Sequence, residues 1–397
     1  MSEEFRRSLK NRLPPMLPTR APWADPSATP QEEEEDDDEE ELADDVGEMS
    51  RRFSVRTDVS PLSASQFFEQ ALAVTPPGRD ATFRVYLTPP TPGAAPSKTN
   101  PFGTYVIAHH GAGASGLSFA ALAKEIKARA PDLGVLAFDC RGHGKTTVEN
   151  GSSDTDLSRD TLVADFTALI EHVFPNPKES PSLVLVGHSM GAVPILAATP
   201  VLQKNGYNIP GVAVLDVVEG TAVESLPRMK GILGKRPTSF LSVPDAVQWH
   251  LASGSVRNAE SARVSVPSYV VPIQSGAGPD DKQQWRIDLL KTEPYWAEWY
   301  DGLSNLFLTA RCARLLVLAG QERLDRELMV GQMQGKFQLE VMQDVGHFLQ
   351  EDDPATLATT LVAFWKRNTQ VLVLPPKIGA PGGLGGPSVS VKHVGER

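Results

Sequence analysis

The feature that most constrains the fold of this chain is a short apolar segment that runs directly into a serine-containing turn. In this turn, glycines lie two residues before and two residues after the serine. Residues 183–186 are aliphatic and partly β-branched, which predicts a buried strand. The sequence GHSMG follows without a break at residues 187–191, and an alanine-rich stretch typical of a helix comes next. In such a strand–turn–helix the central serine is held in a strained conformation, and the two glycines let strand and helix approach closely. We therefore predict that Ser189 is a nucleophile.

The pattern around this turn is an alternation of strands and helices. It predicts a mostly parallel central sheet with helices on both faces, which is an α/β fold. The expected strands are residues 104–108, 134–138, 182–186, 211–218, 315–319 and 337–342, and the expected helices are residues 118–129, 159–174, 190–198 and 356–367. Ahead of them we expect a short helix at residues 63–72 and an edge strand at residues 81–90, which ends in two prolines.

Changes in composition divide the chain into segments. The two ends are rich in proline and have few apolar side chains whose burial could offset the entropy lost on ordering. The insertion after the first half of the fold is far longer than an ordinary loop. We predict a disordered acidic tail at 1–59, a first core part at 60–218, a cap at 219–311 with a mobile loop at about 265–284, a second core part at 312–370 and a disordered tail at 371–397.

Charge and cysteine content narrow the class of protein. The net charge is -11, but residues 32–48 hold thirteen acidic and no basic side chains, so the rest of the chain carries +2. We therefore expect no nucleic acid or membrane partner. Cys140 and Cys312 are too few for a disulfide framework and lack metal-ligand spacing. With no secretory signal and no apolar run near the ~18 residues of a membrane span, we expect a cytoplasmic protein, with the nucleus as a second location, and no metal or cofactor.

A serine nucleophile needs a histidine as base and an acid that orients it. Three histidines follow Ser189 in the chain: His250, His347 and His393. His250 lies in the predicted cap and His393 in the predicted C-terminal tail, whereas His347 follows the last expected strand, so we predict His347 as the base. His188 precedes the nucleophile directly, and we expect its side chain to point away from the cleft.

Spacing alone leaves the acid open. Asp216 lies at the end of the strand next along the chain from the nucleophile, and Asp325 lies beyond the following strand, where many hydrolases carry their acid. Glu219 is a less favoured third candidate. The carboxylates that do not serve as the acid are expected to be solvated or to cap helices.

An oxyanion formed at the serine needs two backbone N–H donors. We predict Met190, directly after the nucleophile, and Ala112 in the sequence HGAG, which follows the first expected core strand. A second loop with the sequence DCRGHG follows the next strand at residues 139–144. We interpret its aspartate and arginine as structural and His143 as a loop histidine.

Several longer segments resemble the protein phosphatase methylesterase family in a fungal-like form. The similarity spans residues 83–367 and includes segments of the predicted cap, where generic esterases diverge. The matching segments are GHSMG (187–191), LDVVEGTA (215–222), RNAESARVS (257–265), GLSNLFL (302–308) and GQMQGKFQ (331–338).

The resemblance implies a carboxylesterase of the α/β-hydrolase fold. It implies Asp216 as the triad acid, which leaves Asp325 as a structural residue, and His347 as the triad histidine. The implied substrate is the C-terminal leucine methyl ester of the catalytic subunit of protein phosphatase type 2A, alone or in its scaffold-bound heterodimer. Its tail would enter a cleft between cap and core, with Met333 as an exposed contact. The alternatives are a broad small-ester or lipid hydrolase and an inhibitory scaffold that binds the phosphatase.

Overall fold

The computed structural model describes residues 58–91, 100–149, 154–274, 278–320 and 324–369. Its main sheet has the strand order β1-β2-β4-β3-β6-β7-β11-β12, and the short β5 pairs with β2. The strands are β1 (Gln70–Val74), β2 (Ala81–Thr88), β3 (Thr104–His109), β4 (Leu133–Phe138), β5 (Thr147–Val148), β6 (Ser182–His188), β7 (Gly211–Leu215), β11 (Ala313–Ala319) and β12 (Gln338–Met342). All neighbours from β4 to β12 are parallel, which confirms the predicted mostly parallel sheet.

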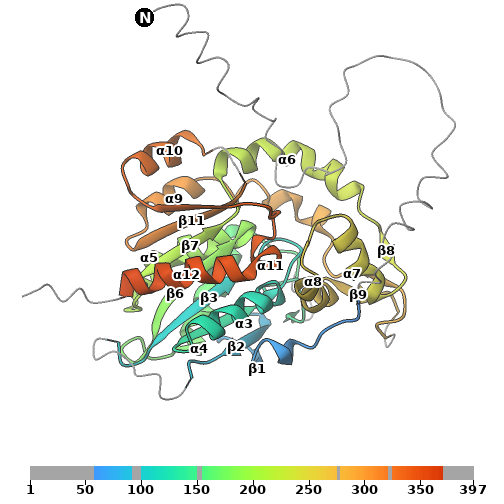
Figure 1. Ribbon diagram of the computed structural model, residues 1–397, viewed down its shortest axis with the longest axis horizontal. Helices are drawn as coiled ribbons and strands as arrows, with labels where there is room; N and C mark the ends of the chain where they lie inside the picture. Colours follow the sequence, from blue (N-terminus) through green and yellow to red (C-terminus); the bar gives the residue numbers. More distant parts are fainter. Residues whose placement is uncertain (1–57, 92–99, 150–153, 275–277, 321–323, 370–397) are drawn as a thin grey trace, which may run out of the picture.

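Both faces of the sheet are covered by helices (Figure 1). Side chains of a strand alternate between faces, and in β6 Leu183 and Leu185 belong to one core cluster whereas Val184 and Val186 belong to the other. This explains why β6 is apolar without interruption. The covering helices are α4 (Arg159–Val173) and α5 (Ala192–Lys204) on one face, and α3 (Ala120–Arg129) and α12 (Pro354–Thr369) on the other.

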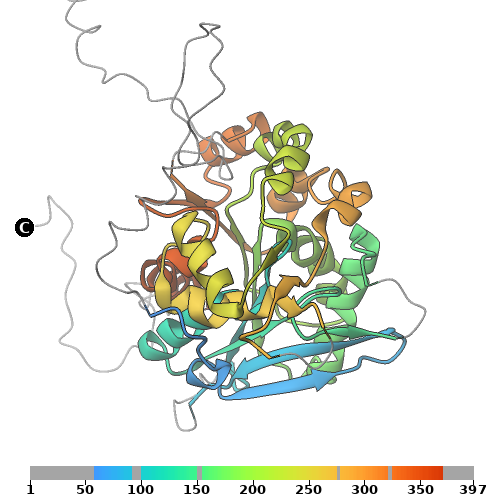
Figure 2. The same cartoon turned by 90° about the vertical axis from the view of Figure 1, so that its right-hand side faces the viewer.

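The N-terminal edge of the sheet differs from the prediction. Only Ala64–Gln66 form a short 3-10 helix, η1. The last three residues of the predicted helix, 70–72, begin β1, which pairs with β2 along five residues. The prediction of β2 as an edge strand was therefore wrong, because β2 lies between β1 and β4 (Figure 2). Phe67 and Phe68 are buried in the core between η1 and β1. Long-range pairing and this burial override the local helical pattern.

The residues predicted to form the cap contain a small three-stranded antiparallel sheet with the order β8-β10-β9, and several helices (Figure 1). These elements are α6 (Glu219–Gly234), β8 (Ser239–Phe240), α7 (Val243–Ala252), α8 (Ala259–Ser265), η4 (Val266–Ser268), β9 (Val270–Pro272), β10 (Gln283–Trp285), η5 (Leu289–Tyr295) and α9 (Leu303–Thr309). Phe240, Val247 and Val256 pack in a core of their own. The segment limits and the mobility of residues 265–284 stay predictions.

Membrane spans are absent from the described ranges, where no helix is both long and apolar enough to cross a bilayer.

Candidate active site

The turn after β6 has the predicted geometry. Ser189 has a φ of 51°, in the left-handed region that non-glycine residues rarely adopt. A Cβ on Gly187 would lie 2.5 Å from the carbonyl oxygen of Gly191, and a Cβ on Gly191 would lie 2.4 Å from the carbonyl oxygen of His109. Only glycine fits at both positions, because strand, turn and helix are in backbone contact.

Strand register brings the other chemical groups to the same edge of the sheet. His188 of β6 is opposite Leu215 of β7, and Leu215 is opposite Val317 of β11. Ser189 and Asp216 therefore leave neighbouring parallel strands side by side. Asp216 also has a positive φ, of 50°, and its side chain is fully buried.

His347 lies against Asp216 in the structure. Its Nδ1 is 2.8 Å from Oδ2 of Asp216, and the other carboxylate oxygen accepts the backbone N–H of Ala319 at 2.7 Å. A carboxylate only accepts hydrogen bonds, so Nδ1 of His347 carries the proton and Nε2 presents a lone pair. The His347 side chain is 21% exposed, whereas the Asp216 side chain is fully buried. The imidazole therefore connects the buried carboxylate with the surface of the site.

The competing carboxylates have other partners. Asp325 caps α10 (Arg326–Met333) by accepting the N–H of Leu328 at 2.9 Å, and it also accepts the hydroxyl of Ser304. Glu219 accepts the N–H groups of Gly302 and Ser304 at the start of α9. Both side chains therefore accept hydrogen bonds from backbone N–H groups at the N-termini of helices.

The other histidines considered from the sequence, His250 and His188, are both buried. His250 donates from Nδ1 to the carbonyl of Ala246 inside the cap. His188 is completely buried, its ring lies 4.7 Å from that of His347, and its Nε2 donates to the His347 carbonyl at 2.8 Å. It supports the loop of His347 from behind, and burial holds its pKa well below the usual value. His393 lies outside the described residues.

The two predicted oxyanion donors are both unpaired. Neither the N–H of Ala112 nor that of Met190 donates a hydrogen bond within the described part of the chain. Met190 precedes the first turn of α5, where such orphan N–H groups are expected. A Cβ on Gly111 would lie 2.8 Å from Nδ1 of His188 and 3.0 Å from Cβ of Ser189. The loop that carries Ala112 is therefore packed directly against Ser189.

Two cap residues near the nucleophile were not predicted. Tyr300 lies close enough to Ser189 for the serine to influence its phenol, and burial raises the pKa of that phenol to about 12. Leu289 packs on the oxyanion loop, with its Cδ1 3.1 Å from the place of a Cβ on Gly113. Ser189 itself is only 8% exposed. The aromatic composition of this segment indicated packing, but no sequence pattern specified that it packs over the serine.

A further carboxylate links the cap to the loop of His347. Asp352, at the end of α11 (Leu349–Asp352), accepts the N–H of Gly346 at 2.6 Å and the N–H of Arg257 at 2.7 Å. Burial raises its pKa. One buried side chain thus connects the cap residue Arg257 with the residue that precedes His347.

The predicted contact residue lies on the surface. Met333, the last residue of α10, is 83% exposed, and Met329 and Val330 of the same helix are about half exposed. Leu328 and Gly331 face the core. One side of α10 is therefore apolar and open.

These features place the chain among the α/β hydrolases. The Alpha/beta hydrolase family matches residues 106–360. A crystal structure of E-2-(acetamidomethylene)succinate hydrolase aligns with a TM-score of 0.54 at 16% identity, over 75% of this chain and 100% of that chain. The thioesterase domain from the curacin biosynthetic pathway aligns with a TM-score of 0.53 at 20% identity, over 74% and 99%. These likenesses show the fold alone.

Closer relatives define the family. Protein phosphatase methylesterase 1 of Cryptococcus neoformans var. neoformans serotype D is 60% identical over 100% of both chains. The proteins of that name from Aspergillus fumigatus and Schizosaccharomyces pombe are 45% and 42% identical, over 81% and 79% of this chain and 76% and 87% of theirs. The chain belongs to the protein phosphatase methylesterase family and is a hydrolase, which confirms the resemblance.

Proposed function

We propose that this enzyme hydrolyses the methyl ester on the C-terminal leucine of the catalytic subunit of protein phosphatase type 2A. The observation that carries the proposal is the 2.8 Å contact of His347 with buried Asp216, beside a serine on a strained turn. The names of its full-length relatives support a protein phosphatase as the substrate.

The reaction is an acyl transfer through Ser189. Its Oγ bonds to the ester carbonyl carbon while Nε2 of His347 takes the hydroxyl proton. When the tetrahedral intermediate collapses, the bond to the methoxy oxygen breaks, and His347 returns the proton so that methanol leaves. Water then attacks the acyl-enzyme with His347 again as base, and the leucine carboxylate and free Ser189 result. Asp216 keeps His347 in the required tautomer and stabilises its protonated form.

The charge on the carbonyl oxygen is stabilised by backbone donors. The unpaired N–H groups of Ala112 and Met190 support this role, because a preformed donor in a site shielded from water needs no reorganisation during reaction. Loss of one such donor costs on the order of 10²–10³ in kcat.

The substrate is a whole protein, so recognition extends beyond the ester. We propose that the catalytic subunit, also in its scaffold-bound heterodimer, contacts the exposed side of α10 at Met333, and that its tail enters between cap and core. We also propose a cytoplasmic location, with the nucleus as a second one, and imaging of a fluorescent fusion tests it.

Methanol release from the methylated heterodimer tests the function. Ser189→Ala is expected to lower kcat by at least about 10³-fold, while Ser65→Ala, at an exposed position, retains the wild-type rate. The isolated methylated tail peptide is assayed in parallel. A wild-type rate in Ser189→Ala would contradict the proposed nucleophile.

The same assay separates the alternatives. Equal turnover of the tail peptide, simple acyl esters and the heterodimer would support a broad ester hydrolase. Phosphatase inhibition by wild type and Ser189→Ala alike, without methanol release by either, would support an inhibitory scaffold.

A further inference from the structure

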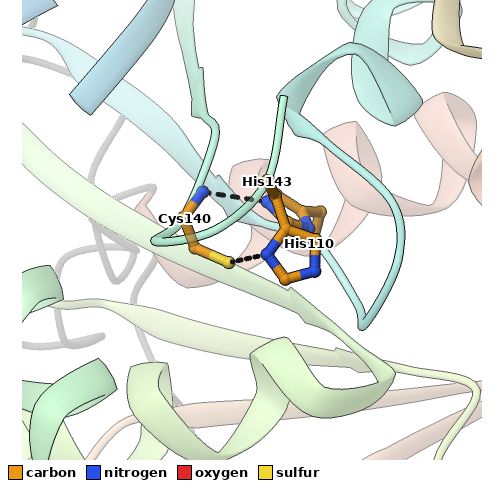
Figure 3. Close-up of side chains that lie close together, drawn as sticks. All are labelled: His110, Cys140 and His143. Atoms are coloured by element: carbon orange, nitrogen blue, oxygen red, sulfur yellow. Dashed lines mark hydrogen bonds between the residues drawn. The ribbon is translucent and has the colours of Figure 1, made fainter. Parts of the chain in front are cut away.

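A buried cluster of potential metal ligands lies next to the predicted oxyanion loop. His110 follows β3, and Cys140 and His143 follow β4 (Figure 3). All three are buried, and one ligand atom from each lies within 4.8 Å of the others. Proximity alone would be compatible with a metal ion, so the partners of each atom decide what the cluster does.

Hydrogen bonds already engage the imidazole nitrogens. The backbone N–H of Cys140 donates to Nε2 of His110 at 2.9 Å, and the backbone N–H of Gly113 donates to Nε2 of His143 at 2.9 Å. A backbone amide can only donate, so both Nε2 atoms are unprotonated and both rings carry their proton on Nδ1. Those Nδ1 atoms bond to backbone carbonyls at 2.8 Å. A metal ion would have to displace these bonds, which argues against a metal site.

The same bonds connect two loops. Gly116 adds a third link, because its N–H donates to Oδ1 of the buried Asp139 at 2.8 Å. The loop of residues 139–144 therefore holds the oxyanion loop at His110, Gly113 and Gly116. The first two of these points flank Ala112.

The link to Gly113 is the one that controls Ala112 most directly. Gly113 has a φ of 76° and lies within a turn, so without a fixed partner it could adopt several conformations. The orientation of the Ala112 N–H depends on the few backbone dihedrals between the anchored residues. An acceptor held opposite the Gly113 N–H removes that freedom.

We propose that His143 is a positioning residue for the esterase reaction: its unprotonated Nε2 holds Gly113 so that the N–H of Ala112 points at the developing oxyanion. His143 touches no substrate. The inference rests on the proposed function, since it assigns to Ala112 the role of an oxyanion donor.

The surroundings of His143 preserve the required form of the ring. Burial lowers its pKa to about 4, so it is neutral near pH 7. Its Nδ1 proton is directed at the carbonyl of Arg141, and Arg141 itself is buried and paired with Asp165. The prediction that this arginine is structural agrees with that ion pair. The nitrogen that accepts the Gly113 N–H therefore belongs to a loop that these contacts hold in place.

Two amide side chains test the two nitrogens of the ring separately. His143→Asn places a polar group near Nδ1 and removes the acceptor for Gly113, whereas His143→Gln can place a carbonyl oxygen near Nε2. We expect kcat for methanol release from the methylated heterodimer to fall about 10²-fold in His143→Asn, with KM unchanged, and to recover to within about tenfold of wild type in His143→Gln.

A second measurement reports on the oxyanion itself. A trifluoromethyl ketone that adds to Ser189 should lose affinity in His143→Asn by a factor similar to the loss in kcat. His250→Asn is the matched control, because it also removes a buried histidine bonded through Nδ1 to a carbonyl. It should leave kcat and ketone affinity near their wild-type values.

Three results would overturn the proposal: a wild-type kcat in His143→Asn, equal losses in the asparagine and glutamine variants, or unfolding of His143→Asn while His250→Asn folds. Failure of the proposed function would look different, because the wild type would then release no methanol from the phosphatase. In that case the His143 variants are compared on p-nitrophenyl acetate, where the same oxyanion forms.

Discussion

Individual residues at the site are held in conformations that local chain preferences disfavour. Among the described residues only Ser189, Asp216 and Asp344 combine a side chain with a positive φ. Such a conformation costs on the order of 1 kcal/mol or more and persists only where neighbours impose it. Asp216 is held by the N–H of Ala319, and Ser189 by the close contact of strand and helix. Two of the three strained residues thus belong to the proposed triad.

Gly111 offers a test at this scale. In Gly111→Ala the new methyl group would meet His188 at 2.8 Å and Ser189 at 3.0 Å, so the nucleophile or the oxyanion loop must shift. We expect kcat to fall by about tenfold or more and stability to fall by about 1–3 kcal/mol. Kinetics and urea unfolding measure these effects.

The control is Gly231→Ala, which lies within α6 with no atom of another element within 4 Å of the new Cβ. It should keep wild-type kinetics and be as stable or slightly more stable, because alanine favours a helix. A wild-type kcat in Gly111→Ala would mean that the loop can accommodate the methyl group, and it would contradict this prediction.

Whole elements are connected through α11. Glu351 is completely buried and accepts hydrogen bonds from the hydroxyls of Tyr269, at 2.8 Å, and Ser265, both in the cap. Burial raises the pKa of Glu351 to about 8. Together with Asp352, this side chain joins the cap to the loop of His347.

The pH dependence of stability tests that connection. The folded-state pKa of Glu351 lies above its ordinary value of 4.5, so between these values the folded state binds the extra proton. This group therefore makes the protein less stable as pH rises from about 4.5 through about 8. The side chain in Glu351→Gln is neutral at every pH. The free energy of unfolding of this variant should therefore increase relative to that of the wild type as pH rises from about 4.5 to about 8. Urea titrations at several pH values measure the difference, and parallel curves would contradict the assigned pKa.

At the scale of the whole molecule, residues of the predicted cap lie close to Ser189, and α10 keeps one apolar side exposed elsewhere. Tyr300 lies close to Ser189 and Leu289 packs against Gly113, whereas Met333 is among the most exposed large apolar side chains. Substrate must therefore enter beside or displace cap residues. A protein substrate that contacts α10 would bring its tail to this entrance.

Met333→Lys tests recognition at this scale. Because 83% of the side chain is exposed, we expect no loss of stability and unchanged turnover of p-nitrophenyl acetate. Affinity for the phosphatase heterodimer should fall about tenfold or more, as measured by titration calorimetry. Gln332→Lys adds the same charge at the neighbouring exposed position and should bind nearly as well as wild type. Equal binding by Met333→Lys would remove this residue from the contact.

The sequence by itself determined the alternation of strands and helices, the turn around Ser189 and the place of His347 after the last strand. These features depend on local requirements: continuous burial of a parallel strand, glycines where backbones touch, and chain order. From spacing alone the acid stayed open between Asp216 and Asp325, and the family resemblance then favoured Asp216.

Only the tertiary structure brought Asp216 to His347 and assigned Asp325 to a helix cap, because strand register decides which carboxylate meets the imidazole. It also shortened the predicted N-terminal helix to η1 and placed its last residues in β1, paired His143 with Gly113 and brought Tyr300 close to Ser189. The contacts of Asp216 with His347 and of His143 with Gly113 join residues that are distant in the chain, where a one-residue change in register would give another partner.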